Sequence, residues 1–117
     1  MELYDAVAAL GALAQDTRLA VFRHLVKIGP SGAPAGSVAA ALGVPAPTLS
    51  FHLKELERAG LVTQRRASRN VIYAADYAGM RALLVYLTKD CCAGNPAVCD
   101  FNTENSNEPA ACSPACA

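Results

Sequence analysis

The sequence predicts a mainly helical fold with one small β-hairpin, of the α+β class, in a single domain with a tail. Apolar residues recur at helical spacing over most of the first 60 residues. The period then changes to two short strand-like runs, and a last helical stretch follows Asp76. Hydrophobic residues make up 53% of the 117, which is enough for a core. A chain this small buries only about two-thirds of its unfolded surface, so pairing with a second copy would stabilise it.

Two helices are predicted in the first 30 residues. Apolar residues at helical spacing indicate a helix from about Leu3 to Ala14. Asp16 is a suitable N-cap for a second helix, which ends near Gly29–Pro30. One face of this second helix is apolar and carries Leu19, Phe22 and Val26.

The next segment predicts two helices joined by a tight turn. Residues 29–36 are a loop rich in glycine, proline and serine, and an alanine-rich helix spans Ser37 to Leu42 before a glycine. Pro45 or Pro47 can open the following helix, because proline is tolerated in a first helical turn. That helix runs to about Ala59, and the glycine after it fits the C′ position.

A basic hairpin follows the second of these helices. Residues 61–66 and 70–74 are typical of short strands, and Ala67–Arg69 would be their turn. Asp76 can cap a last helix with apolar residues at i, i+3, i+4 and i+7, which are Met80, Leu83, Leu84 and Leu87. The order of elements predicts a winged helix-turn-helix with about five helices and a two-stranded wing.

Charge is segregated along the chain, although the formal net charge is zero. Residues 44–73 hold five basic and two acidic side chains, a net of +3, whereas residues 90–117 hold four acidic side chains and no Lys or Arg. A local basic surface is what contact with phosphates requires. DNA binding is therefore a candidate function, and a solvated basic face on a helix-turn-helix that binds no DNA is the alternative.

The helix that opens near Pro47 has two different faces. Leu49, Leu53 and Leu56 form an apolar stripe, and the opposite face can enter a major groove. Serine and lysine there can bond bases or phosphates, a phenylalanine can touch a thymine methyl group, and the hairpin arginines can hold the backbone. The predicted DNA contacts are Pro47, Thr48, Ser50, Phe51, His52, Lys54, Arg65, Arg66 and Arg69.

His52 differs from the other members of this set in its position on the helix. It lies about 60° from the apolar stripe, at its flank. The position suits a packed or capping residue as well as a phosphate contact.

All five cysteines lie in the last 27 residues, after 90 residues that contain none. Cys91, Cys92 and Cys99 share the run CCAGNPAVC, in which glycine and proline favour a turn. Soft thiolates select soft acceptors, and trivalent arsenic or antimony takes three of them in a trigonal pyramid. Tetrahedral zinc with Cys112 or Cys116 as a fourth ligand, and a thiol redox sensor, are the alternatives.

Three stretches of this chain resemble the ArsR/SmtB family of metal-sensing repressors. ALAQDTRL at residues 12–19 is similar to the family's opening signature, LSFHLKELERAGLV at 49–62 to its recognition-helix signature, and RRASRNVIY at 65–73 to its wing. The resemblance covers about residues 3–90. It implies a homodimer, paired through the first and last helices, that leaves its operator DNA when a metal ion binds. By position, Ser50 and His52 then belong to the DNA-binding helix.

The chain departs from the family pattern where the inducer usually binds. The helix at residues 37–42 has no Cys-x-Cys pair, and residues 76–90 contain no histidine. The cysteine run resembles instead the C-terminal site of an arsenite-responsive branch. We therefore expect residues 1–90 to bind DNA and dimerise, and residues 91–117 to hold the inducer site and a flexible tail.

The function expected from these patterns is a repressor that dissociates from an inverted-repeat operator when As(III) or Sb(III) binds Cys91, Cys92 and Cys99. No cofactor is required. The alternatives are the same fold sensing methylarsenite or a thiophilic metal such as zinc, cadmium or lead, or a thiol redox sensor.

Other classes of protein are disfavoured by what the sequence lacks. No apolar run approaches the roughly 20 residues of a membrane span, and the first residues lack the basic start of a secretory signal. A cytoplasmic protein with no membrane partner is expected. Phosphate-binding, metalloprotease and nucleophile-elbow motifs are absent from the sequence, so an enzyme is not expected. A vicinal-thiol arsenate reductase and a metallochaperone are the functional rivals.

Overall fold

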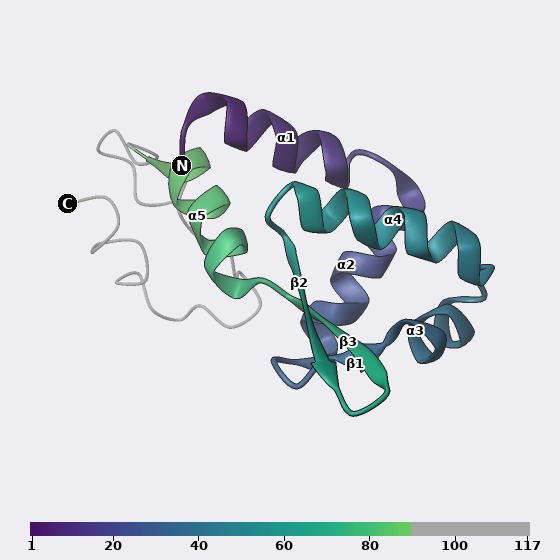
Figure 1. Ribbon diagram of the computed structural model, residues 1–117. Coiled ribbons are helices and arrows are strands. Elements are labelled where there is room, and N and C mark those ends of the chain that lie inside the picture. The colour runs from purple at the N-terminus through teal and green to yellow at the C-terminus, as the bar shows by residue number, and fades with distance from the viewer. Residues whose placement is uncertain (90–117) are drawn as a thin grey trace, which may run out of the picture. The chain divides into compact units, whose positions relative to one another are not determined.

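The computed structural model describes residues 1–89, which form five helices and three strands. The helices are α1 (Leu3–Leu13), α2 (Asp16–Ile28), α3 (Ala35–Leu42), α4 (Ala46–Arg58) and α5 (Tyr77–Thr88). The strands are β1 (Ala33–Pro34), β2 (Val62–Ala67) and β3 (Asn70–Ala75). The chain leaves α4, follows β2 to a hairpin turn and returns along β3 (Figure 1). The predicted winged helix-turn-helix, with five helices and a hairpin wing, is confirmed.

Residues 1–83 form one compact unit, and its core is organised around α4. Leu49, Leu53 and Leu56 are fully buried, as the predicted apolar stripe requires. Helices α1, α2 and α3 all contact α4, so the second helix of the helix-turn-helix is supported from several sides. This support fixes which face of α4 is left for solvent.

The packed face of α2 differs from the predicted one. Val21, Phe22 and Leu25 are buried, whereas Leu19 remains 43% exposed. Helix α2 packs against β3 as well as α4, which moves the centre of the buried stripe away from the predicted face. The predicted N-cap was also wrong: the side chain of Gln15, rather than Asp16, accepts the N–H of Arg18 at 2.8 Å.

The wing is an antiparallel sheet in the order β1–β3–β2. The predicted hairpin is confirmed, but its turn is shorter than expected, because Ala67 pairs with Asn70 and only two residues lie between them. The segment predicted as a loop at residues 29–36 contains β1, which pairs with β3, and the first residues of α3. Ala33 and Pro34 carry no strand pattern by themselves; their pairing depends on β3.

The start of α5 is fixed by the predicted cap. The N–H of Gly79 donates to the Asp76 carboxylate at 3.0 Å, and the Tyr77 hydroxyl donates to the Val26 carbonyl oxygen at 2.9 Å. Of the predicted apolar stripe on α5 only Leu83 is buried. None of the helices formed by residues 1–89 combines the length and apolar character that a bilayer crossing needs.

Candidate nucleic-acid interface

The solvent-facing side of α4 carries most of the predicted DNA contacts. Pro45 is the N-cap and Pro47 lies in the first turn, so α4 begins where the sequence predicted. We call the exposed predicted contacts in its first three turns the reading face: Pro47, Thr48, Ser50, Phe51 and Lys54. Phe51 is 56% exposed, which is unusual for a side chain of its size in water. The reading face thus combines an apolar ring with a hydroxyl and an ammonium group.

His52 does not belong to the reading face. Only 8% of the residue is exposed, so it lies with the packed residues, as one of the two sequence interpretations allowed. Its Nδ1 atom is buried and has no hydrogen-bond partner in the described part of the chain. Burial, and secondarily the charge of Arg18, lower the pKa of His52. Its ring meets that of Phe51 edge to face, with centroids 5.6 Å apart.

The three predicted arginines of the wing are exposed but do not have equal surroundings. The Nη2 atom of Arg65 donates to the Ser31 carbonyl oxygen at 2.6 Å. Within residues 1–89, Arg66 and Arg69 make no hydrogen bond or ion pair through their side chains. Next to Arg65, the amide of Gln64 donates to both carboxylate oxygens of Glu57 on α4, at 2.9 and 3.2 Å. These side-chain contacts could not be read from sequence spacing.

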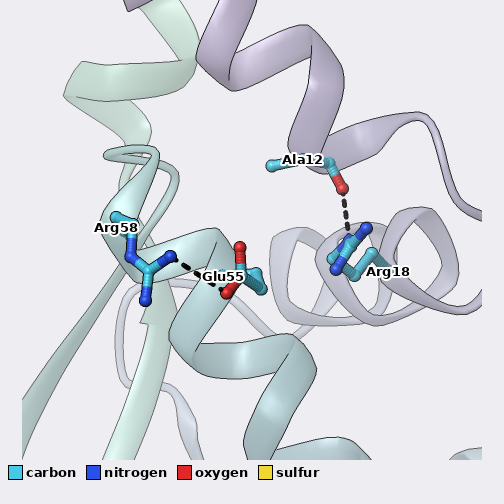
Figure 2. A network of polar contacts seen from close by, with 4 residues as sticks. All are labelled: Ala12, Arg18, Glu55 and Arg58. Carbon is cyan, nitrogen blue, oxygen red and sulfur yellow. Dashed lines mark hydrogen bonds and ion pairs between the residues drawn. The ribbon is translucent and has the colours of Figure 1, made fainter.

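Two further arginines lie near the C-terminal half of α4. The Nη1 atom of Arg58 lies 3.2 Å from a Glu55 carboxylate oxygen, and the Nε of Arg18 donates to the Ala12 carbonyl oxygen at 2.8 Å (Figure 2). Arg18, Glu55 and Arg58 line a hollow of about 290 Å³, together with small residues of α1 and α4. The Arg58 side chain is 75% exposed, so its ion pair adds little stability.

The predicted inducer ligands Cys91, Cys92 and Cys99 lie outside the described residues, as do Cys112 and Cys116. Among residues 1–89 no three or more His, Cys, Asp or Glu side chains gather in a way that could hold a metal ion.

Comparisons with known proteins agree with this geometry. A model of a helix-turn-helix domain matches residues 13–65. The transcriptional regulator HlyU from Vibrio vulnificus CMCP6 is 32% identical in sequence, the match covers 70% of this chain and 82% of that chain, and the TM-score is 0.54. No curated protein matches.

Two other solved structures are informative. A homodimeric winged helix-turn-helix DNA-binding domain from Mycobacterium bovis, a possible ArsR-family transcriptional regulator, is 25% identical over 74% of this chain and 78% of that chain, with a TM-score of 0.62. The antimony-specific transcriptional repressor AntR is 29% identical over 69% of this chain and 72% of that chain, with a TM-score of 0.55. With its exposed reading face and basic wing, the chain belongs to the ArsR family of winged helix-turn-helix transcriptional regulators.

Proposed function

We propose that this regulator is a homodimeric repressor that binds an inverted-repeat operator and releases it when As(III) or Sb(III) binds Cys91, Cys92 and Cys99. The observation that carries the DNA-binding part is the reading face of α4, exposed beside a fully buried leucine stripe. The inducer part rests on the sequence, in which the only thiols follow residue 90.

Operator recognition would divide between α4 and the wing. The first turns of α4 would lie in the major groove, where Ser50 and Lys54 bond base edges or phosphates and Phe51 touches a thymine methyl group. The wing arginines would hold the phosphate backbone, which makes affinity strongly dependent on salt. Within residues 44–73 the basic residues outnumber the acidic ones by three, which favours that electrostatic role.

Dimerisation is supported by apolar side chains that a single chain leaves in water. On α1, Leu3 and Val7 are each 57% exposed and Tyr4 is 84% exposed. On α5, Leu84, Val85 and Leu87 are 47–58% exposed. Helices of a water-soluble fold rarely expose such groups unless another surface covers them. A second copy would cover them and would place two α4 helices in successive major grooves, about 34–36 Å apart.

The inducer site is proposed from the chemistry of its donor set. Three thiolates suit a trivalent, thiophilic ion better than they suit hard cations. The similarity to AntR, whose name states antimony specificity, favours the same ligand class. The thiols follow α5 directly in sequence, so inducer binding would act next to the proposed dimer contact. A coupling of about 1–3 kcal/mol would weaken operator binding roughly 5–150-fold, and operator DNA would weaken inducer binding by the same factor.

Fluorescence anisotropy can test both parts with one labelled operator, selected from a random duplex library. The wild-type protein should bind the selected duplex tightly and lose affinity as arsenite is added. A variant with Cys91, Cys92 and Cys99 changed to Ser should bind DNA equally well and ignore arsenite. The matched control with Cys112→Ser and Cys116→Ser should respond as the wild type does.

The two parts fail separately. Arsenite release that survives in the triple variant would show that the inducer site is elsewhere. Failure of the wild-type protein to select any duplex would reject DNA binding, and a metallochaperone would then explain thiol-dependent metal binding.

A further inference from the structure

We infer that Arg65 is a positioning residue of the wing, and that Arg66 and Arg69 make the wing's contacts with DNA phosphates. The inference rests on the proposed DNA-binding function and refines it, because the sequence alone gives the three arginines the same role. It follows from where the guanidinium of Arg65 is bonded and from how its acceptor is held.

The acceptor of Arg65 belongs to the turn between α2 and β1. Nη2 of Arg65 donates to the Ser31 carbonyl oxygen at 2.6 Å, across 34 residues of sequence. The bond is charge-assisted, and such bonds are shorter and stronger than neutral ones. The turn itself is closed by the N–H of Gly32, which donates to the Gly29 carbonyl oxygen at 3.1 Å. Arg65 is thus bonded to a fixed backbone atom.

Gly32 holds this turn close against β3. Its φ is +71°, and a Cβ at this position would collide with the Tyr73 carbonyl oxygen and the Ile72 side chain. The next two residues, Ala33 and Pro34, pair with Tyr73 and Ile72 in the sheet. Since only glycine allows so close an approach, the turn that carries the Ser31 carbonyl packs tightly against β3.

A second contact holds β2 to α4. Successive residues of a strand point to opposite faces, so Gln64 and Arg65 leave β2 in opposite directions. Gln64 donates to Glu57 near the end of α4, while Arg65 reaches the turn before β1. The strand is therefore held from both faces, and the two bonds set the angle of the wing relative to α4.

Arg66 and Arg69 are placed beyond these two contacts. Arg66 pairs with Val71 near the end of the hairpin, and Arg69 lies in the two-residue turn beside Ser68, whose φ is +61°. Both side chains are exposed and make no bond within residues 1–89. Their charges remain available for phosphates at a position that the Arg65 and Gln64 contacts determine.

The salt dependence of operator binding separates positioning from phosphate contact. Each phosphate contact contributes about 0.9 to the slope of log affinity against log salt concentration. In the full-length homodimer, Arg66→Gln removes one contact from each subunit, so it should lower the steepness of that slope by about 1.8, twice the value for one contact. Arg65→Gln should weaken binding at every salt concentration but leave the slope as in the wild type. An equal loss of slope in both variants would overturn the assignment of Arg65.

A double-mutant cycle gives a second, independent measurement. Gly32→Ala moves the acceptor without changing any charge, so it should weaken binding with the wild-type slope. The double variant Gly32→Ala with Arg65→Gln should bind operator about as well as the single variant that binds less tightly. Both changes remove the same interaction, so their losses should not add. Fully additive losses would contradict the inference. If Gly32→Ala does not fold, as circular dichroism would reveal, the slopes of the two arginine variants still decide.

The outcome is distinguishable from failure of the proposed function. If the wild-type protein shows no salt-dependent preference for the selected operator, DNA binding itself is rejected. If the wild type binds and only the Arg65 and Arg66 slopes disagree with expectation, the repressor function stands and the assignment of Arg65 is wrong.

Discussion

Gly79, in the first turn of α5, lies directly against the backbone carbonyl oxygen of Gly60, just past the end of α4. The same junction is fixed by two bonds of Asp76, whose N–H donates to the Leu61 carbonyl oxygen at 2.8 Å and whose carboxylate accepts the N–H of Gly79 at 3.0 Å. The backbone just past the end of α4 and the first turn of α5 are therefore in contact. A side chain at position 79 has no space.

Gly79→Ala should lower the free energy of unfolding by about 1–3 kcal/mol, the usual range for overpacking. The matched control is Gly36→Ala in α3, where an added Cβ meets nothing within 4 Å. That change should be neutral or stabilise by up to about 1 kcal/mol, because alanine favours a helix over glycine. Urea unfolding at one fixed protein concentration measures both. Equal effects in the two variants would mean that the Gly60–Gly79 contact is not tight.

The contact between Gly60 and Gly79 also marks the limit of prediction from sequence. Two helix starts that depend on local chemistry, the cap at Asp76 and the start near Pro47, were predicted correctly, whereas the local cap of α2 was placed one residue too late. Burial on α4 was predicted because three leucines alone define its stripe. Interactions between distant segments, such as β1 with β3 or Arg65 with Ser31, have no local signal and needed the structure.

For the candidate site, sequence periodicity identified the reading face but placed His52 too close to it. A residue at the flank of the leucine stripe, such as His52, is buried or exposed depending on which helices pack beside it. Because α4 has several neighbouring helices, that flank is covered. The cysteine ligands lie outside the described residues, so they remain predictions from donor chemistry.

Substitutions at Phe51 and Leu53 should separate the proposed DNA recognition from stability on one helix. Phe51→Ala removes an exposed ring, so it should leave the unfolding midpoint nearly unchanged. It should reduce the binding preference for the operator, over a duplex in which the contacted thymine is replaced, by about 1–3 kcal/mol. Leu53→Ala removes a fully buried side chain and should cost about 2–5 kcal/mol of stability. Anisotropy and thermal unfolding, measured on both variants, should give opposite rankings. A Phe51→Ala variant that keeps the operator preference of the wild type would contradict the proposed contact.

His52 should make the fold sensitive to mild acid. Its pKa is lowered from 6.5 by burial and by Arg18, so between the lowered value and 6.5 the unfolded chain binds a proton that the folded chain does not. The free energy of unfolding should therefore be highest above pH 6.5 and should fall as the pH drops toward the folded-state pKa. His52→Leu should lose this part of the pH dependence.

The titration can also be followed directly by the imidazole proton resonances of His52, assigned by their loss in the His52→Leu variant. A midpoint at or above 6.5 in the folded protein would contradict the lowered pKa.

Cys99→Ser should distinguish among the proposed inducers by the number of thiolates each needs. Arsenite has three positions for sulfur, whereas methylarsenite has two open positions, which Cys91 and Cys92 could fill. The variant should therefore lose most of its response to arsenite and keep its response to methylarsenite, measured as release of labelled operator. Cys112→Ser is the control and should retain both responses. Loss of both responses in Cys99→Ser would make Cys99 obligatory for either ligand.

Among residues 1–89, the order β1–β3–β2 leaves β2 as an edge strand that pairs on one side only, with β3. Exposed edges can add strands from other molecules, and charged side chains oppose this association. Arg65 and Arg66 both lie on that edge, so the side chains proposed to position the wing and to meet DNA would also keep wings of different molecules apart. Replacing both with valine or isoleucine would expose a short, uncharged strand prone to self-assembly. Loss of operator binding in such a variant would then reflect aggregation, whereas glutamine at the same positions keeps the edge polar.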